Sequence, residues 1–160
     1  MAVDDVGRAY LVSTVRPLHP EEQTLAEMLQ GWRNQQLSRN LRFETIDARI
    51  KQVERFVQHS NEHPWTWTVA MVDEFFGDLR SIHNLSQSSI RSYQVGLRQF
   101  CSYVANPDYG WDRVCEELFG THPSQVFFDW NTAQHVQENE SRPNKRAFTK
   151  REIQDFFDHA

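Results

Sequence analysis

The sequence predicts an all-α fold, a compact orthogonal bundle of four to five helices. Apolar residues recur at spacings of three and four along most of the chain, which places them on one face of a helix. No stretch shows the sustained alternation of apolar and polar residues that is typical of a strand, and only residues 126–128 form a short apolar run that resembles one. The length of 160 residues and the 39% content of hydrophobic residues suit one domain with a core.

The first two predicted helices cover residues 21–38 and a segment that follows Thr45 and ends before Pro64. Thr45 is the predicted N-cap, because a threonine hydroxyl accepts a hydrogen bond from a free backbone N–H of the first turn. Pro64 cannot donate a backbone hydrogen bond and ends the pattern. The predicted buried faces consist of Leu25, Met28, Leu29 and Trp32 in the first helix and Ile46, Ile50, Val53 and Val57 in the second.

Three further helices are predicted by the same signals. Thr68 is the expected N-cap of the third helix and Ser86 that of the fourth. The fourth ends before Pro107, and the fifth covers Trp111–Phe119 and stops at Gly120. The predicted buried faces are Val69, Val72, Phe75, Phe76 and Leu79; then Ile90, Tyr93, Leu97, Phe100, Cys101 and Val104; and finally Trp111, Val114, Cys115, Leu118 and Phe119.

The basic residues are concentrated in three stretches, residues 33–55, 80–98 and 142–151. A net charge of −5 taken alone argues against a nucleic-acid partner. However, the three stretches contain 14 of the 17 Lys and Arg residues and only three acidic ones. If they meet in space, the fold has a basic side and an acidic side, as DNA binding requires. The alternative is that they are ordinary solvated helix faces.

The outer face of the fourth helix shows the clearest binding pattern. It carries Ser88, Arg91 and Arg98 and no carboxylate, and Gln87 and Gln94 lie near its start. A helix that is only solvated usually mixes both signs of charge, whereas a helix in a DNA groove presents hydroxyls, amides and arginines near its start. The pattern therefore favours DNA contact.

The second and fourth helices share the spacing of their apolar anchors, which predicts a pseudo-symmetric pair with similar polar N-terminal ends. Free N–H groups and the helix dipole at such ends favour a phosphate. Chance similarity between two amphipathic helices is the alternative. Gly96 costs about 1 kcal/mol relative to alanine inside a helix, which predicts the close approach of another helix. The repeated anchors are Ile46, Val53 and Phe56 and, 44 positions later, Ile90, Leu97 and Phe100.

Taken together, these motifs resemble the N-terminal core-binding domain of phage-integrase-type tyrosine recombinases, in an actinobacterial or actinophage branch. The resemblance implies a SAM-like helical domain that clamps one face of duplex DNA while a catalytic domain holds the other. It rests on the order and spacing of motifs between residues 39 and 160: Thr45, Ile46 and Phe56, the runs 85–93 and 97–103, and the segment 146–153; residues 115–120 and 129–131 indicate the branch.

The resemblance implies a DNA-binding domain of a site-specific recombinase that acts in DNA integration and recombination. The expected partners are double-stranded DNA of an attachment core site, the protein's own catalytic domain and other recombinase protomers. The linker is expected to follow the DNA. With the residue pattern, this gives the expected DNA-binding residues: Arg42, Thr45, Arg49, Gln87, Ser88, Arg91, Gln94, Arg98, Arg142, Lys145 and Arg146.

The last residues predict the start of a further helix. Thr149 and Glu152 form a capping box, and Ile153, Phe156 and Phe157 begin an apolar face without a partner inside this chain. We therefore expect a front domain cut from a longer protein. The expected division is a disordered lead over residues 1–20, the core-binding domain over 21–135, a basic linker over 136–147 and the first helix of a truncated catalytic domain over 148–160.

No catalytic residue is expected in this chain, because the catalytic residues of that family follow the segment that begins at Arg146. No cofactor or metal is expected either: His59 and His63 have the spacing of a helical zinc pair, but no third ligand follows. Cys101 and Cys115 lie on apolar helix sides, where free cysteine acts as a small hydrophobe. Neither a signal peptide nor a membrane span is recognisable, so we expect a bacterial, cytoplasmic and nucleoid-associated protein.

A second interpretation belongs to a different functional class. The chain would be a helical protein–protein interaction domain with an acidic surface and no role on DNA. In that case Ile153, Phe156 and Phe157 would dock to a partner, and the basic stretches would only balance charge.

Overall fold

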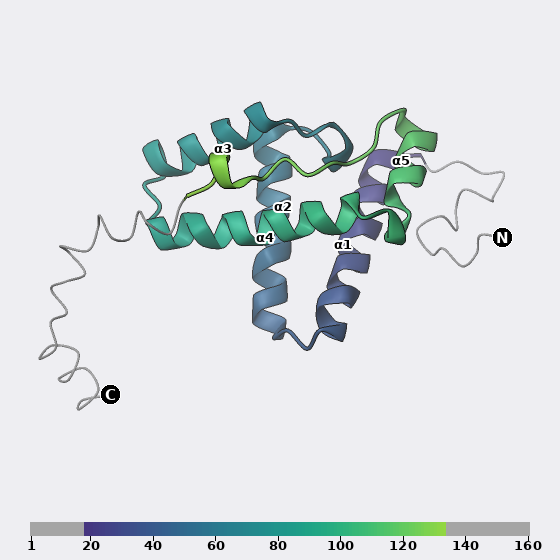
Figure 1. Cartoon of the computed structure of the whole chain (residues 1–160), viewed down its shortest axis with the longest axis horizontal. Helices are drawn as coiled ribbons and strands as arrows, with labels where there is room; N and C mark the ends of the chain where they lie inside the picture. Colours follow the sequence, from purple (N-terminus) through teal and green to yellow (C-terminus); the bar gives the residue numbers. More distant parts are fainter. Residues whose placement is uncertain (1–17, 134–160) are drawn as a thin grey trace, which may run out of the picture.

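The computed structural model describes residues 18–133, and these residues form five α-helices joined by short connections (Figure 1). Within this range there is no strand, so the predicted all-α class is confirmed. Short 3-10 turns lie in the segments between and after the α-helices. The α-helices are α1 (Pro20–Ser38), α2 (Phe43–Ser60), α3 (Val69–Ser81), α4 (Gln87–Ala105) and α5 (Trp111–Phe119), and the turns are η3 (Pro64–Thr66), η4 (Pro107–Tyr109) and η5 (Asp129–Asn131).

Helix α2 is the centre of the arrangement, because it contacts α1, α3 and α4. Helices α1 and α2 form an antiparallel hairpin, and α4 crosses α2 (Figure 1). Helix α5 follows at the C-terminal end of α4 (Figure 1). The crossing of α2 and α4 agrees with the predicted orthogonal bundle. No helix within residues 18–133 is long and apolar enough to cross a membrane.

The core is rich in aromatic side chains. The ring of Phe56 on α2 lies 4.6 Å from Trp67, 5.0 Å from Phe75 and 5.8 Å from Phe127, measured between ring centroids, and all three pairs have edge-to-face geometry. Such pairs add roughly 0.5–1.5 kcal/mol each to the effect of apolar burial. The predicted apolar faces all contribute to this core, although Leu25, Ile50, Val57, Val69, Phe76, Tyr93, Leu118 and Phe119 are only partly buried at its edge.

Three of the predicted helix boundaries are confirmed by their capping geometry. The hydroxyl of Thr68 accepts a hydrogen bond from the backbone N–H of Met71 at 3.4 Å, and that of Ser86 accepts one from Ser89 at 3.2 Å. Gly120 ends α5 in the left-handed region with φ of 79°, which a residue without Cβ adopts readily.

The predicted N-cap at Thr45 is wrong. Helix α2 begins at Phe43, after Arg42 in an extended conformation, and no side chain caps it. The physical reason lies in the preceding turn, where Asn40 adopts φ of 64° and the backbone N–H of Leu41 donates to Gln36 at 3.1 Å. This tight reversal allows the helix to start earlier, so Thr45 lies within its first turn.

The close approach predicted from Gly96 is confirmed. A Cβ atom at this position would lie 2.4 Å from Oε1 of Gln52 on α2. The predicted pairing of the second and fourth helices is therefore found at their crossing. Their N-terminal ends differ, however, because Ser86 caps α4 and no side chain caps α2, and Figure 1 places the two ends apart.

The apolar run at residues 126–128 is an extended strap rather than a strand. Val126 and Phe127 are buried in the core. Their backbone N–H groups both donate to Oε1 of Gln125, at 3.0 and 2.9 Å, so these donors do not need a neighbouring strand. We call residues 125–133 the strap.

Candidate nucleic-acid interface

Two shallow hollows adjoin the outer face of α4. The α2–α4 hollow lies between α4 and the first half of α2, and the α4–η5 hollow lies between α4 and the strap. Val95 lines both hollows, and we call the exposed part of α4 around Val95 the α4 ridge. The α2–α4 hollow is lined by Arg42, Glu44, Thr45, Ala48, Arg49, Gln52, Ser92 and Val95, and the α4–η5 hollow by Arg91, Gln94, Val95, Arg98, Asp129, Thr132 and Ala133.

The structure thus brings together two of the three basic stretches. Arg42 and Arg49 line one hollow, Arg91 and Arg98 line the other, and all four were expected to bind DNA. Thr45, another expected DNA-binding residue, is half-buried in the α2–α4 hollow. The convergence provides four guanidinium groups around one helix ridge.

Arg49 is also a structural tie between three helices. Its Nη1 donates to Oε1 of Gln99 on α4 at 2.8 Å and to Oε1 of the fully buried Gln36 on α1 at 3.2 Å. Burial lowers the pKa of Arg49, and the nearby positive charge of Arg39 lowers it further. An arginine keeps its proton at any physiological pH, so this guanidinium is a fixed positive charge.

Arg39 is a further basic residue near Arg49, and it was not among the expected DNA-binding residues. Its charge acts on Arg49, and its own side chain is exposed. In the sequence, Arg39 could have been identified by its position in the basic stretch 33–55. Other members of that stretch have partners elsewhere: Nη2 of Arg33 lies 2.5 Å from Oδ1 of Asp47, and Nη1 of Arg55 donates to the hydroxyl of Tyr93 at 2.8 Å.

The strap occupies part of the outer face of α4. Nη1 of Arg98 lies 3.0 Å from Oδ1 of Asp129, and the side-chain amide of Gln125 donates to Oγ of Ser102 at 2.8 Å. The backbone N–H of Ala133 donates to Oε1 of Gln94 at 2.9 Å. These contacts fix the strap along the helix.

Gln94 therefore differs from the sequence-based expectation. It was expected among the residues that contact DNA, but only 7% of the residue is exposed. The physical reason is that its amide oxygen satisfies the backbone N–H of Ala133, which has no neighbour in a helix or sheet.

The start of α4 keeps the predicted hydroxyl-rich character. Oγ of Ser86 lies 3.2 Å from Oγ of the exposed Ser88 and 3.1 Å from Oγ of Ser89. Gln87 is half-buried at the first position of the helix, and the first turn has no acidic residue. This end can offer hydroxyl groups to a phosphate without a repelling carboxylate in the same turn.

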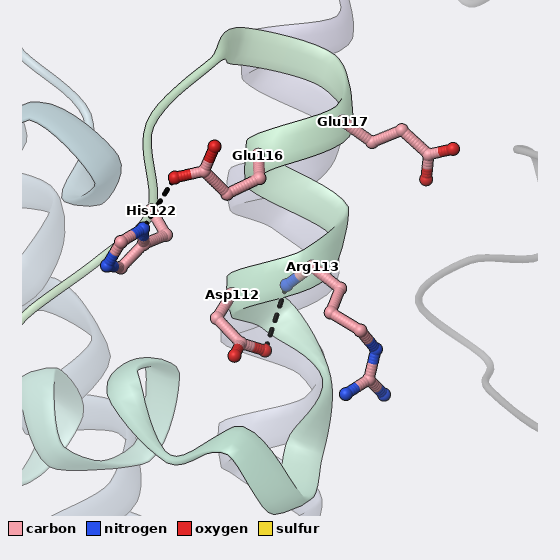
Figure 2. Close-up of a pocket in the computed structure, with 5 residues that line it drawn as sticks. All are labelled: Asp112, Arg113, Glu116, Glu117 and His122. Atoms are coloured by element: carbon pink, nitrogen blue, oxygen red, sulfur yellow. Dashed lines mark hydrogen bonds and ion pairs between the residues drawn. The ribbon is translucent and has the colours of Figure 1, made fainter.

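An acidic hollow lies on α5, away from the crossing of α2 and α4 (Figures 1 and 2). It is lined by Asp112, Arg113, Glu116, Glu117 and His122. Nδ1 of His122 lies 2.6 Å from Oε2 of Glu116, and Figure 2 shows the side chains of Glu116 and Glu117 pointing to different sides. Arg113 therefore has acidic neighbours, and the described fold has an acidic end at α5 and basic residues at the crossing of α2 and α4.

His59, His63 and the two cysteines are held by local contacts. Nε2 of His59 lies 2.7 Å from Oδ2 of Asp78, while the ring of His63 stacks on Trp65 with centroids 5.0 Å apart. Among residues 18–133, no cluster of three or more His, Cys, Asp or Glu side chains could hold a metal ion. Cys101 and Cys115 are buried as predicted, and burial raises the pKa of the Cys115 thiol to about 12.

Three of the expected DNA-binding residues, Arg142, Lys145 and Arg146, lie outside the described residues, as do the segments 1–17 and 134–160. Comparison of the chain with protein-family models, with curated proteins and with solved structures gave no match. The resemblance to recombinase core-binding domains therefore rests on the residues themselves.

Proposed function

We propose that this chain is the DNA-binding domain of a site-specific tyrosine recombinase or integrase, which clamps duplex DNA of a core site through α2 and α4. The observation that carries the proposal is the convergence of Arg42, Arg49, Arg91 and Arg98 on the two sides of the α4 ridge. These residues come from two separate basic stretches, and the acidic hollow of α5 lies elsewhere.

In this proposal the arginines contact phosphates and hold the domain on the duplex. Contacts to phosphate set position and orientation, and contacts to base edges set sequence preference. The partners are attachment-site DNA, a catalytic domain of the same protein and other protomers on the site. Strand cutting and joining belong to the catalytic domain, and the protein works in the bacterial cytoplasm, on the nucleoid.

The test is the salt dependence of duplex binding. If each of the four arginines neutralises one phosphate, a plot of log K against log salt has a slope of about −3 to −4, because each neutralised phosphate contributes about −0.9. Fluorescence anisotropy with a labelled duplex at several salt concentrations measures this slope. An affinity that does not change with salt, or no binding even at low salt, contradicts the proposal.

Arginine variants locate the interface in the same assay. Arg91→Ala or Arg98→Ala should weaken binding and make the slope shallower by about 0.9, since one phosphate contact is lost. Arg113→Ala is the matched control, because it removes the same charge from the acidic hollow of α5. Equal losses at all three positions would show that only overall charge matters and that α4 is no defined interface.

The second candidate function is a helical protein–protein interaction domain. Two observations favour it: the acidic hollow of α5, and the indole of Trp130, which is 70% exposed and stacks on Phe128 with centroids 5.4 Å apart. On this alternative, a basic protein partner would bind α5, and substitution of Glu116 and Glu117 would abolish that binding while Arg91→Ala and Arg98→Ala would leave it unchanged.

A further inference from the structure

Val95 is an exposed apolar residue in the middle of a polar and basic surface. Helix α4 packs its apolar face against α2 and α3, but the side chain of Val95 does not belong to that face, and Val95 is 48% exposed. Its side chain lies between the two arginine-lined hollows and lines both. Single exposed valines are ordinary, so the position of Val95 between four arginines is the informative fact.

The positions of the four arginines on the two sides of α4 determine how a duplex could bind this helix. The major groove is about 12 Å wide and admits one helix, with a phosphate backbone on each side. If α4 enters the groove, Arg42 and Arg49 face one backbone, and Arg91 and Arg98 face the other. The ridge between the hollows then comes nearest to the base edges, and the residue on that ridge is Val95.

We propose that Val95 recognises the C5-methyl group of a thymine in the major groove. This inference rests on the proposed DNA-binding function and names a residue that determines sequence preference. The thymine methyl is the apolar group on the major-groove edge of the four bases, and it pairs with apolar side chains. Ala48 and Thr45 line the same hollow beside Val95 and add methyl groups to this part of the surface.

The surroundings of Val95 fit a methyl group better than a hydrogen-bonding base edge. Oγ of Ser92, one turn away, accepts a hydrogen bond from Nε2 of Gln52 at 3.1 Å. Oε1 of Gln94 accepts one from the backbone of Ala133. The oxygens of both side chains thus accept hydrogen bonds within the protein, and Val95 itself can offer a base edge only apolar contact.

The experiment uses the whole 160-residue chain and has two steps. First, duplexes that bind the wild-type chain are selected from a random pool, and the preferred bases are read. Second, each preferred thymine is replaced by deoxyuridine, which lacks only the methyl group. One replacement should weaken wild-type binding about four-fold, the effect expected for burial of one methyl group.

Val95→Ala should bind the thymine and the deoxyuridine duplexes equally at that position. Ile82→Ala is the control, because Ile82 is 66% exposed at the end of α3 and lines neither hollow. It should keep the four-fold discrimination. Thermal melting shows that both variants are folded.

The other outcomes separate the two proposals. If the chain binds duplexes but deoxyuridine is neutral at every position, or if Val95→Ala retains the discrimination, the inference about Val95 is overturned and the DNA-binding function stands. If the chain binds no duplex at any salt concentration, both are overturned.

Discussion

At the crossing of α2 and α4, side chains of α2 lie directly against the backbone of α4 at Gly96. Gly96 faces Oε1 of Gln52, and the amide of Gln52 donates to Ser92 of α4, so both helices share one small contact. Arg49 lies beside them, with its Cγ 3.3 Å from the place of a Cβ at Gly96. This contact fixes where α2 crosses α4, and hence the distance between the arginines of the two hollows.

Gly96→Ala should therefore destabilise the fold. Alanine favours the helix by about 1 kcal/mol over glycine, but its methyl group would displace the end of the Gln52 side chain and break its hydrogen bond to Ser92, and overpacking costs roughly 1–3 kcal/mol. We expect a net loss of about 1 kcal/mol in the free energy of unfolding, measured by urea denaturation. Adding Gln52→Ala should relieve the clash and make the alanine at position 96 favourable. An unchanged or increased stability of the single variant would contradict the tight crossing.

Residue signals in the sequence were reliable where a local rule decides the structure. Thr68, Ser86 and Gly120 follow capping rules that need only a few neighbouring residues, and all three were predicted correctly. Thr45 was assigned wrongly because the preceding turn closes through a backbone bond from Leu41 to Gln36. The burial of Gln94 was not predicted, because its partner, Ala133, is distant in sequence.

At the scale of elements, the strap is the feature that a periodic pattern does not predict. It has no helix of its own apart from η5, yet it places Val126 and Phe127 in the core and Asp129 next to Arg98. The apolar periods of the five helices were sufficient to predict their buried faces. The path of the strap along α4 depends on tertiary contacts, such as that between Ala133 and Gln94, which a local pattern does not predict.

The pair between Arg98 and Asp129 should compete with DNA. The side chain of Asp129 is 87% exposed, and its carboxylate repels a phosphate as well as holding the guanidinium. Asp129→Asn should therefore tighten duplex binding, by about five-fold at most, since exposed ion pairs are worth up to ~1 kcal/mol. Anisotropy titration at low salt measures the change.

Asp112→Asn provides the matched control for this prediction. It removes the same charge from α5, so a general effect of net charge would appear in both variants. Weaker binding by Asp129→Asn, or an equal gain in both variants, would show that Arg98 does not contact the DNA.

At the scale of the whole molecule, basic side chains gather at the crossing of α2 and α4, and acidic side chains gather on α5. The three basic stretches of the sequence predict such a separation if they meet in space. The structure brings the first two together only in part, because Arg33 and Arg55 have partners elsewhere. Glu44 and Asp129 also lie within the two hollows, so the basic surface is narrower than the stretches suggest. The residues of the third stretch lie outside the described range.

The most direct measurement is an NMR titration of the 15N-labelled chain with duplex DNA. We expect the amide signals of residues 42–49 and 87–98 to shift together as DNA is added, while those of α5 stay in place. Salt should reverse the shifts, since the proposed contacts are mainly to phosphates. Shifts centred on α5, or signals that do not move at low salt, would contradict the claim that α2 and α4 form a DNA interface.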